Sequence, residues 1–370
     1  MLLKIFRRHL KVQNSNISLL QIEQFKLESG LILDEVEIAY TTYGQLSKSG
    51  DNAILVFHAL TGSHLLAGEY EQFDDSNLPW NDELELGWWD DFVGPNRAID
   101  TSKYFVICAN YLGGCYGSTG PNSGQFYPGK EFPEIDFKDI ENTQKNLVEH
   151  LGVKSLHAVV GPSIGGLMAL EFAARFPNFV KKIISISSGF EISTLQLLHN
   201  LEQAYVLNLG KNAEDRKKEY LALARMIAHK TYISLELLAN RAKEETKYKP
   251  EHLDGFIKTS EESYMMHQGE KFIERFTIES YLSIIRGWQN FKLPESLLPN
   301  LSSTDVLILS VDSDVCFYPE QQTQLSKILS QNGCTVKIEH LHSEKGHDSF
   351  LLEPNLYEYP IKTFLESREK

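Results

Sequence analysis

The chain has 370 residues, more than one compact domain usually has, so we expect a core domain with a sizeable insertion. Hydrophobic residues make up 42% and aromatic residues 11% of the chain, which is typical of a folded globular protein. Its formal net charge of −14 argues against a protein that coats nucleic acid or an anionic membrane. The N-terminus has no signal-peptide core, no window is apolar enough to span a bilayer, and the four cysteines form no CxxC pair. We therefore expect a cytoplasmic protein with reduced thiols.

The predicted strands begin in residues 19–43, where apolar and polar residues alternate with a period of two. This period indicates antiparallel strands at one edge of a sheet. Short and almost continuous apolar runs follow, and they predict strands of a parallel sheet that is covered on both faces. These runs are residues 53–59, 104–109, 156–161, 182–187 and 306–311, with a weaker run at 336–341.

Helices are predicted between these strands. One covers residues 137–151 and ends before Gly152, and another covers residues 164–176 and is stopped by Pro177. Alternating strands and helices indicate the α/β class with a mostly parallel sheet.

A long stretch between two of the strands lacks the strand pattern. From residue 190 to residue 299 helical patterns replace it, for example at 214–229, 234–245 and 277–291. We expect an all-helical lid here, inserted over the carboxyl ends of the strands. The core domain is then formed by two pieces, residues 1–189 and residues 300–370.

A sharp turn between a strand and a helix carries Gly-Pro-Ser-Ile-Gly at residues 161–165. This is a G-x-S-x-G motif in the strand–turn–helix context that is typical of α/β-hydrolases. The turn presents the serine hydroxyl at a helix N-terminus, where free backbone N–H groups stabilise developing negative charge. The alternative is a glycine-rich turn without chemistry. We predict that Ser163 is a nucleophile.

A serine hydroxyl needs a base, and His347 is the best candidate among the 12 histidines. It follows Gly346 in a loop after the last predicted strand, which agrees with the order Ser, acid, His in α/β-hydrolases. His340 and His342 lie on or beside that strand, where a core or surface role is expected, and His58 ends an earlier strand.

The acid of the triad should follow the strand at residues 306–311, where two aspartates are available. Asp312 is close to the strand end and fits a turn or capping role. Asp314 lies deeper in the loop, from which it can reach His347, and we predict that it orients the imidazole and stabilises the imidazolium.

An oxyanion hole requires two backbone N–H groups. One is expected from Ile164, the residue after the nucleophile, and the other from Leu60, in the loop after the strand at residues 53–59. The alternative for Leu60 is an ordinary turn at the end of a strand.

Several segments of the chain form a family pattern, namely His58-Ala-Leu-Thr-Gly62, Trp88-Trp-Asp-Asp-Phe-Val-Gly-Pro95, Gly161-Pro-Ser-Ile-Gly-Gly166, Ala224-Arg-Met-Ile227 and Ser313-Asp314. The segments Asn110-Tyr-Leu-Gly-Gly-Cys-Tyr-Gly-Ser-Thr-Gly-Pro121 and Gly346-His-Asp-Ser-Phe350 are the most discriminating, because a generic esterase needs neither. In all of these segments the chain resembles the homoserine O-acetyltransferase family.

The resemblance implies transfer of an acetyl group from acetyl-CoA to the hydroxyl of L-homoserine, through an acetyl-Ser163 intermediate, in methionine biosynthesis. It implies that Arg225 grips the α-carboxylate and Asp348 the α-ammonium of the amino acid, with Tyr232 in the same pocket. A guanidinium and a carboxylate suit the two charges of a zwitterion. On the sequence alone, Arg225 also fits a helix surface and Asp348 a loop cap.

The resemblance also implies that no resident cofactor or metal is needed, since acetyl-CoA is a co-substrate. It implies a homodimer formed through the helical lid, as is common in the family, and no nucleic-acid or membrane partner.

Some residues depart from the family pattern. Pro162 and Ile164 stand where Gly and Met are more common, and Cys316 and Tyr318 stand where bulkier apolar residues and a second proline are common. These changes leave the triad intact but bear on the acyl pocket, so a succinyl donor is an alternative to acetyl. Two further alternatives are a serine esterase with the same triad and a binding protein that has lost catalysis.

Overall fold

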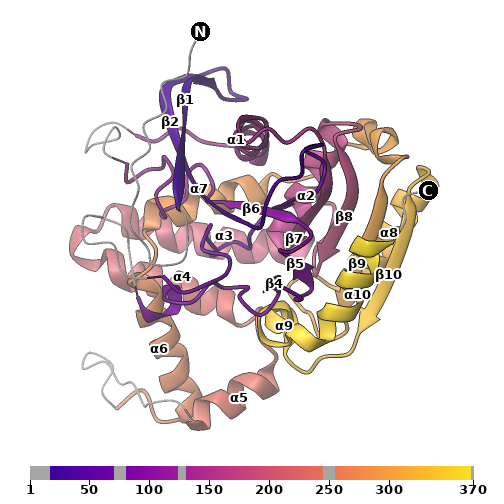
Figure 1. Ribbon diagram of the computed structural model, residues 1–370. Coiled ribbons are helices and arrows are strands. Elements are labelled where there is room, and N and C mark those ends of the chain that lie inside the picture. The colour runs from indigo at the N-terminus through magenta and orange to yellow at the C-terminus, as the bar shows by residue number, and fades with distance from the viewer. Residues whose placement is uncertain (1–16, 71–80, 124–130, 245–254, 368–370) are drawn as a thin grey trace.

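The computed structural model describes residues 17–70, 81–123, 131–244 and 255–367. Its centre is an eight-stranded sheet in the order β1-β2-β6-β3-β7-β8-β9-β10, in which β1 and β2 are antiparallel to their neighbours and the other pairs are parallel (Figure 1). The strands are β1 (Ser18–Lys26), β2 (Ile32–Tyr43), β3 (Ala53–Val56), β6 (Phe105–Ala109), β7 (Leu156–Pro162), β8 (Val180–Ile186), β9 (Asp305–Val311) and β10 (Thr335–Leu341). A separate parallel pair joins β4 (Val93–Gly94) to β5 (Ile99–Asp100).

Helices cover both faces of the sheet. Apolar side chains of α1, α2 and α8 pack in one buried cluster, and those of α10 pack in a second cluster on the other side. Sheet residues supply both clusters, which explains why the central strands read as continuous apolar runs. These helices are α1 (Phe137–His150), α2 (Ile164–Arg175), α8 (Pro319–Gln331) and α10 (Pro354–Glu366), with the short α9 (Ser349–Leu352) before the last.

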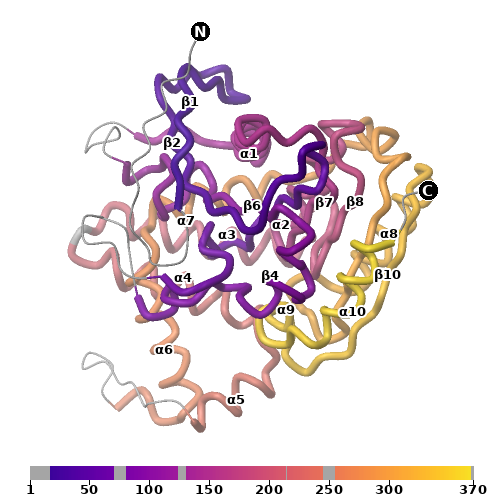
Figure 2. The backbone as a smooth tube through the Cα atoms, viewed as in Figure 1, coloured from indigo at the N-terminus to yellow at the C-terminus, as the bar shows by residue number. Residues whose placement is uncertain are grey.

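In the described residues between β8 and β9, the chain forms five α-helices. Backbone hydrogen bonds join the two ends of this insertion, from Ile192 N–H to Phe291 O at 3.2 Å and from Leu293 N–H to Phe190 O at 2.8 Å. The outer helices of the insertion lie on the opposite side of the molecule from β10 and α8, as the chain trace shows (Figure 2). The five are α3 (Thr194–Lys211), α4 (Lys217–His229), α5 (Leu235–Glu244), α6 (Ser260–Ile273) and α7 (Ile278–Gln289).

The α/β architecture is confirmed, and so are the antiparallel strands at the leading edge. One predicted helix is shorter than expected, because residues Glu214–Arg216 form a 3-10 turn and α4 begins only at Lys217. Within the described residues, no helix is both long and apolar enough to cross a membrane.

Candidate active site

Ser163 occupies the sharp turn between β7 and α2. Its backbone has φ +56° and ψ −129°, a conformation that non-glycine residues rarely adopt. Close packing forces this turn, because a Cβ on Gly161 would lie 2.1 Å from Gly165 O and one on Gly165 would lie 2.2 Å from Phe57 O. The two glycines of the motif are therefore required by the approach of β7, α2 and the end of β3.

The three predicted triad residues are joined in series by hydrogen bonds. The Nε2 atom of His347 lies 2.9 Å from Ser163 Oγ, and its Nδ1 atom lies 2.8 Å from Asp314 Oδ2. The other carboxylate oxygen of Asp314 accepts hydrogen bonds from the backbone N–H groups of Cys316 and Phe317, both at 2.8 Å. Ser163, His347 and Asp314 are all buried. This geometry suits a nucleophile, a base and an acid that orients the base.

The surroundings of His347 strengthen it as a base. Burial disfavours the imidazolium, but the negative charge and hydrogen bond of Asp314, together with the charge of Asp348, outweigh that effect. The pKa of His347 is therefore raised above its ordinary value of 6.5.

The rejected candidates lie elsewhere. Asp312 accepts hydrogen bonds from His342 Nδ1 at 2.6 Å and from the Ser343 backbone at 3.1 Å, so its carboxylate closes a surface turn. His58 is buried and stacks on Tyr111 with ring centroids 3.6 Å apart, and burial lowers its pKa to about 3. Neither Asp312 nor His58 lines the cavity described next.

Two backbone N–H groups are available near Ser163. The N–H of Ile164 is the first of α2 and has no acceptor within that helix. Leu60 is a central residue of a turn that Gly62 N–H closes on Ala59 O at 2.9 Å, and its own N–H has no acceptor among the described residues. Both groups suit an oxyanion hole.

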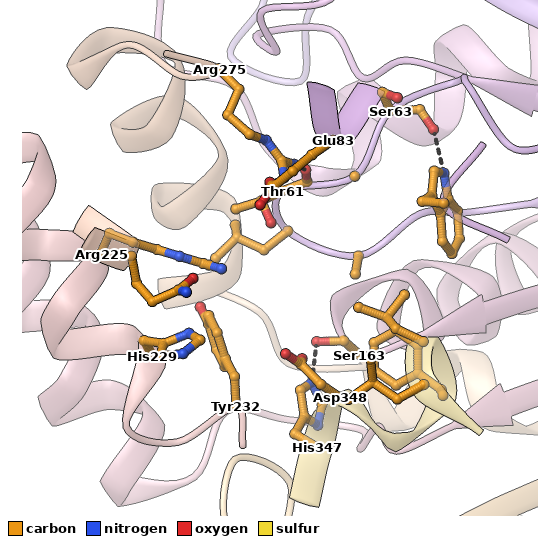
Figure 3. A pocket seen from close by; sticks show the side chains of 18 of the residues that line it. Thr61, Ser63, Glu83, Ser163, Arg225, His229, Tyr232, Arg275, His347 and Asp348 are labelled. Carbon is orange, nitrogen blue, oxygen red and sulfur yellow. Dashed lines mark hydrogen bonds and ion pairs between the residues drawn. The ribbon is translucent and has the colours of Figure 1, made fainter. Parts of the chain in front are cut away.

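Ser163 opens into a cavity of about 260 Å³ between the sheet and the insertion (Figure 3). The sheet side contributes the loop after β3 and the loop that contains His347, and the insertion contributes α4, α5, α6 and α7. Its lining comprises Ala59, Leu60, Thr61, Gly62, Ser63, Leu65, Glu83, Leu84, Leu86, Trp88, Ser163, Arg225, His229, Tyr232, Arg241, Gln268, Arg275, Trp288, His347, Asp348, Phe350, Leu351 and Leu352.

The three predicted substrate residues meet in this cavity. The guanidinium of Arg225 lies over the rings of Tyr232 and Phe272, at 5.2 Å and 5.0 Å from their centroids, and forms no ion pair within the described residues. Figure 3 shows the Tyr232 hydroxyl pointing toward Arg225 and the Asp348 side chain beside His347. Burial raises the pKa of Asp348, although His347, Arg225 and Arg241 act against the increase. Among the residues that the structure describes, neither Arg225 nor Asp348 has an ion-pair partner, and both line this partly desolvated cavity.

Tyr232 also ties the insertion to the catalytic loop. Its backbone carbonyl accepts the N–H of Asp348 at 2.8 Å, and Gly346 packs so closely that a Cβ there would lie 2.8 Å from Ser234 N. Gly346 has φ +74°, which favours glycine. The chain between α4 and α5 therefore holds the loop that carries His347.

Several residues of the cavity are not predictable from the motifs. His229, Glu83 and Arg275 line it, and burial, with the nearby charges of Arg225 and Arg241, lowers the pKa of His229 to about 3. The sequence gives only weak signals for these residues. His229 lies shortly after the Ala224-Arg-Met-Ile227 segment, and Arg275 lies just before a predicted helix, but neither position is specific for an active site.

The glycine-rich segment and the departures from the family pattern lie outside the cavity. A Cβ on Gly113 would lie 2.5 Å from Ser283 Oγ, so this glycine allows the segment to pack closely against α7. The Ile164 side chain is fully buried in the core, and Cys316 lines a separate cavity of about 10 Å³. These residues do not shape the space around Ser163 directly.

The chain is similar to known proteins in sequence and in fold. Residues 52–354 match the family model of the alpha/beta hydrolase fold. Homoserine O-acetyltransferase of Deferribacter desulfuricans is 36% identical over 361 residues, which cover 93% of this chain and 93% of that protein.

Solved structures with the same fold include an esterase and a homoserine O-acetyltransferase. Esterase E22 has a TM-score of 0.83 at 22% identity and covers 95% of this chain and 100% of its own. Homoserine O-acetyltransferase from Bacillus anthracis has a TM-score of 0.82 at 23% identity, with 97% and 99% covered. Because these identities are low, the structures establish the fold alone, and the sequence relationship decides between the two families. The chain belongs to the homoserine O-acetyltransferase family, a family of acyltransferases with the α/β-hydrolase fold.

Proposed function

We propose that this protein transfers the acetyl group of acetyl-CoA to the hydroxyl of L-homoserine, by a ping-pong mechanism in methionine biosynthesis. One observation carries the proposal. The cavity joins the hydrogen-bonded series Ser163–His347–Asp314 to a separate pair of opposite charges, Arg225 and Asp348. An esterase requires the first feature only, whereas an acyltransferase to an amino acid also requires the second.

The first half-reaction forms the acyl-enzyme. His347 Nε2 takes the proton of Ser163 Oγ while that oxygen attacks the thioester carbonyl, and the N–H groups of Leu60 and Ile164 stabilise the resulting oxyanion. The carbon–sulfur bond then breaks, and the CoA thiolate receives the proton from His347. Asp314 keeps the imidazole in the required tautomer and stabilises its charged form.

The second half-reaction places homoserine in the space that CoA leaves. Arg225 pairs with the α-carboxylate and Asp348 with the α-ammonium, while Tyr232 lines the same site. Because Asp348 follows His347 directly, a zwitterion held there can direct its side-chain hydroxyl to His347 Nε2. His347 takes that proton, the hydroxyl oxygen attacks the acetyl carbonyl, and Ser163 recovers its proton as O-acetyl-L-homoserine leaves.

Product analysis tests this proposal against its alternatives. The protein is incubated with acetyl-CoA and L-homoserine, and free CoA, acetate and O-acetylhomoserine are measured together. We expect one O-acetylhomoserine for each CoA released. Acetate as the main product would favour an esterase. Faster turnover with succinyl-CoA would identify succinyl-CoA, instead of acetyl-CoA, as the donor. Release of CoA without formation of O-acetylhomoserine or acetate would contradict both the transferase and the esterase.

Replacing Arg225 with methionine should impair the second half-reaction selectively. The apolar side chain keeps the contacts with Tyr232 and Phe272 but leaves the substrate carboxylate without a partner. We expect kcat/KM for homoserine to fall about 100-fold, since losing one member of a desolvated charge pair costs about 2–5 kcal/mol. The control is Arg216→Met, which removes an exposed arginine paired with Glu219. An equal loss in both variants, or a slower acylation in Arg225→Met, would contradict the assignment.

The acylation rate should rise with pH, since only neutral His347 accepts the serine proton. The activity is present above the His347 pKa and is lost as pH falls through it, at a midpoint above 6.5. Asp348→Asn removes one of the charges that raise this pKa, so the midpoint should move to lower pH. Acylation by acetyl-CoA in the absence of homoserine is the measurement. An unchanged or higher midpoint would refute the coupling of Asp348 to His347.

We also propose that two copies of the chain associate through the insertion. The exposed face of α3 carries an apolar stripe, in which Leu201 is 57% and Tyr205 is 66% exposed. Leu197, Leu198 and Leu209 extend it at helical spacing. A continuous apolar stripe of this kind marks an interaction surface.

Light scattering tests the dimer. The wild-type protein should have twice the chain mass of 42.2 kDa, and the double variant Leu201→Glu with Tyr205→Glu should have the mass of one chain. Tyr359→Glu is the control, because Tyr359 is 75% exposed but lies on α10. A dimer that survives the double substitution would exclude α3 as the interface.

A further inference from the structure

Arg275, in the turn between α6 and α7, contacts the loop that carries one proposed oxyanion donor. One terminal nitrogen of its guanidinium donates to the backbone carbonyl of Thr61 at 2.6 Å, and the other donates to Glu83 Oε2 at 2.5 Å. The side chain is only 17% exposed. The insertion thus reaches the β3 loop by a charged and largely buried hydrogen bond, which is among the stronger kinds in proteins.

The glycine-rich segment fixes Arg275 from its other side. The Tyr116 hydroxyl donates to the Arg275 carbonyl at 2.7 Å and also lies 3.3 Å from Arg275 Nε. The Tyr116 ring packs edge-on against Phe276, with centroids 5.7 Å apart. Both the backbone and the side chain of Arg275 are therefore positioned before any substrate binds.

The contact with Thr61 is transmitted to Leu60 through two peptide units. The Thr61 carbonyl and the Gly62 N–H belong to one planar peptide, and Gly62 N–H donates to Ala59 O at 2.9 Å. The Ala59 carbonyl and the Leu60 N–H belong to the next planar unit in this chain of contacts. Holding the Thr61 carbonyl thus fixes the direction of the Leu60 N–H. A cation at the start of the series also polarises each hydrogen bond that follows.

We propose that Arg275 is a positioning residue that holds the Leu60 N–H in the oxyanion hole and so makes acylation depend on the docked insertion. Arg275 touches neither Ser163 nor His347 and acts only through the Ala59–Gly62 turn. This inference rests on the proposed function only as far as Ser163 is acylated, and it is independent of the acceptor.

The test is the burst of p-nitrophenol when the protein is mixed with p-nitrophenyl acetate, a donor without phosphate or carboxylate for Arg275 to bind. Arg275→Met should slow Ser163 acylation by about 10- to 100-fold, somewhat less than the effect of deleting an oxyanion donor. The pH midpoint of acylation should not change, because the surroundings of His347 are intact. Lys271→Met is the matched control, since Lys271 also lies near Glu83, at 3.9 Å, but has no contact with Thr61.

Arg275→Lys separates positioning from folding. Lysine keeps the charge but cannot bind Thr61 and Glu83 with a fork, so an intermediate rate is expected. The proposal would be overturned if Arg275→Met or Arg275→Lys kept the wild-type burst rate and only the KM for acetyl-CoA increased. Arg275 would then be a ligand-binding residue. An equal loss in Lys271→Met would overturn it as well. A wild-type protein without any burst would instead contradict Ser163 as the nucleophile.

Discussion

Replacing Ser163 with alanine should reduce acyl transfer by about 10⁴- to 10⁶-fold, because the only nucleophile in the hydrogen-bonded series is lost. The remaining activity would come from binding and from the oxyanion donors, which the substitution leaves in place. The measurement is the initial rate of CoA release from acetyl-CoA with homoserine present.

The same substitution should barely change stability. Alanine at residue 163 adopts the same strained backbone at φ +56°, and the tight packing of Gly161 and Gly165 is untouched. We expect the free energy of unfolding to change by less than about 1 kcal/mol. Ser185→Ala on β8 is the control for removing a buried hydroxyl without a catalytic contact. Near-normal turnover in Ser163→Ala would refute the nucleophile, and equal losses in both variants would indicate a folding effect.

Replacing Asp314 with asparagine should reduce kcat by about 10⁴-fold, although the side chain keeps its shape. The backbone N–H groups of Cys316 and Phe317 require an acceptor, so the amide oxygen must face them. The amide NH₂ then faces His347 Nδ1, which must become an acceptor. The imidazole proton moves to Nε2, and Nε2 can no longer take the proton of Ser163.

Asp312→Asn is the matched control, two residues away. That carboxylate pairs with exposed His342 and closes a turn, so we expect little change in kcat. If Asp312→Asn is as damaging as Asp314→Asn, the loss reflects the loop structure and not the tautomer of His347. A mild effect of Asp314→Asn would contradict the assigned role of Asp314.

The core of the fold is predictable because each buried strand is an apolar run and the turn at Ser163 has a specific motif. Strand β3 ends at Val56, three residues before the predicted end, since the run continues into the buried loop at Phe57. Hydrophobicity marks burial in both places and cannot locate the end of the strand. The pair β4 and β5 has two residues in each strand, which is too short for any periodicity.

The spatial neighbours of the site are harder to predict than its motifs. Ser163, Asp314 and His347 are identified by their order and by the elements that precede them. Arg275 has no such signal, because its contacts with Thr61 and Glu83 span 214 and 192 residues of sequence. The glycine-rich segment is recognisable, but its packing against α7 depends on a helix in another part of the chain.

The most direct test of the central claim is mass spectrometry of the intact protein after incubation with acetyl-CoA alone, followed by addition of L-homoserine. We predict that one acetyl group is added, that peptide mapping locates it on Ser163, and that homoserine removes it as O-acetylhomoserine. The absence of an adduct with acetyl-CoA, together with one formed by succinyl-CoA or a simple ester, would contradict acetyl transfer. An adduct that water removes as fast as homoserine does would contradict transfer altogether.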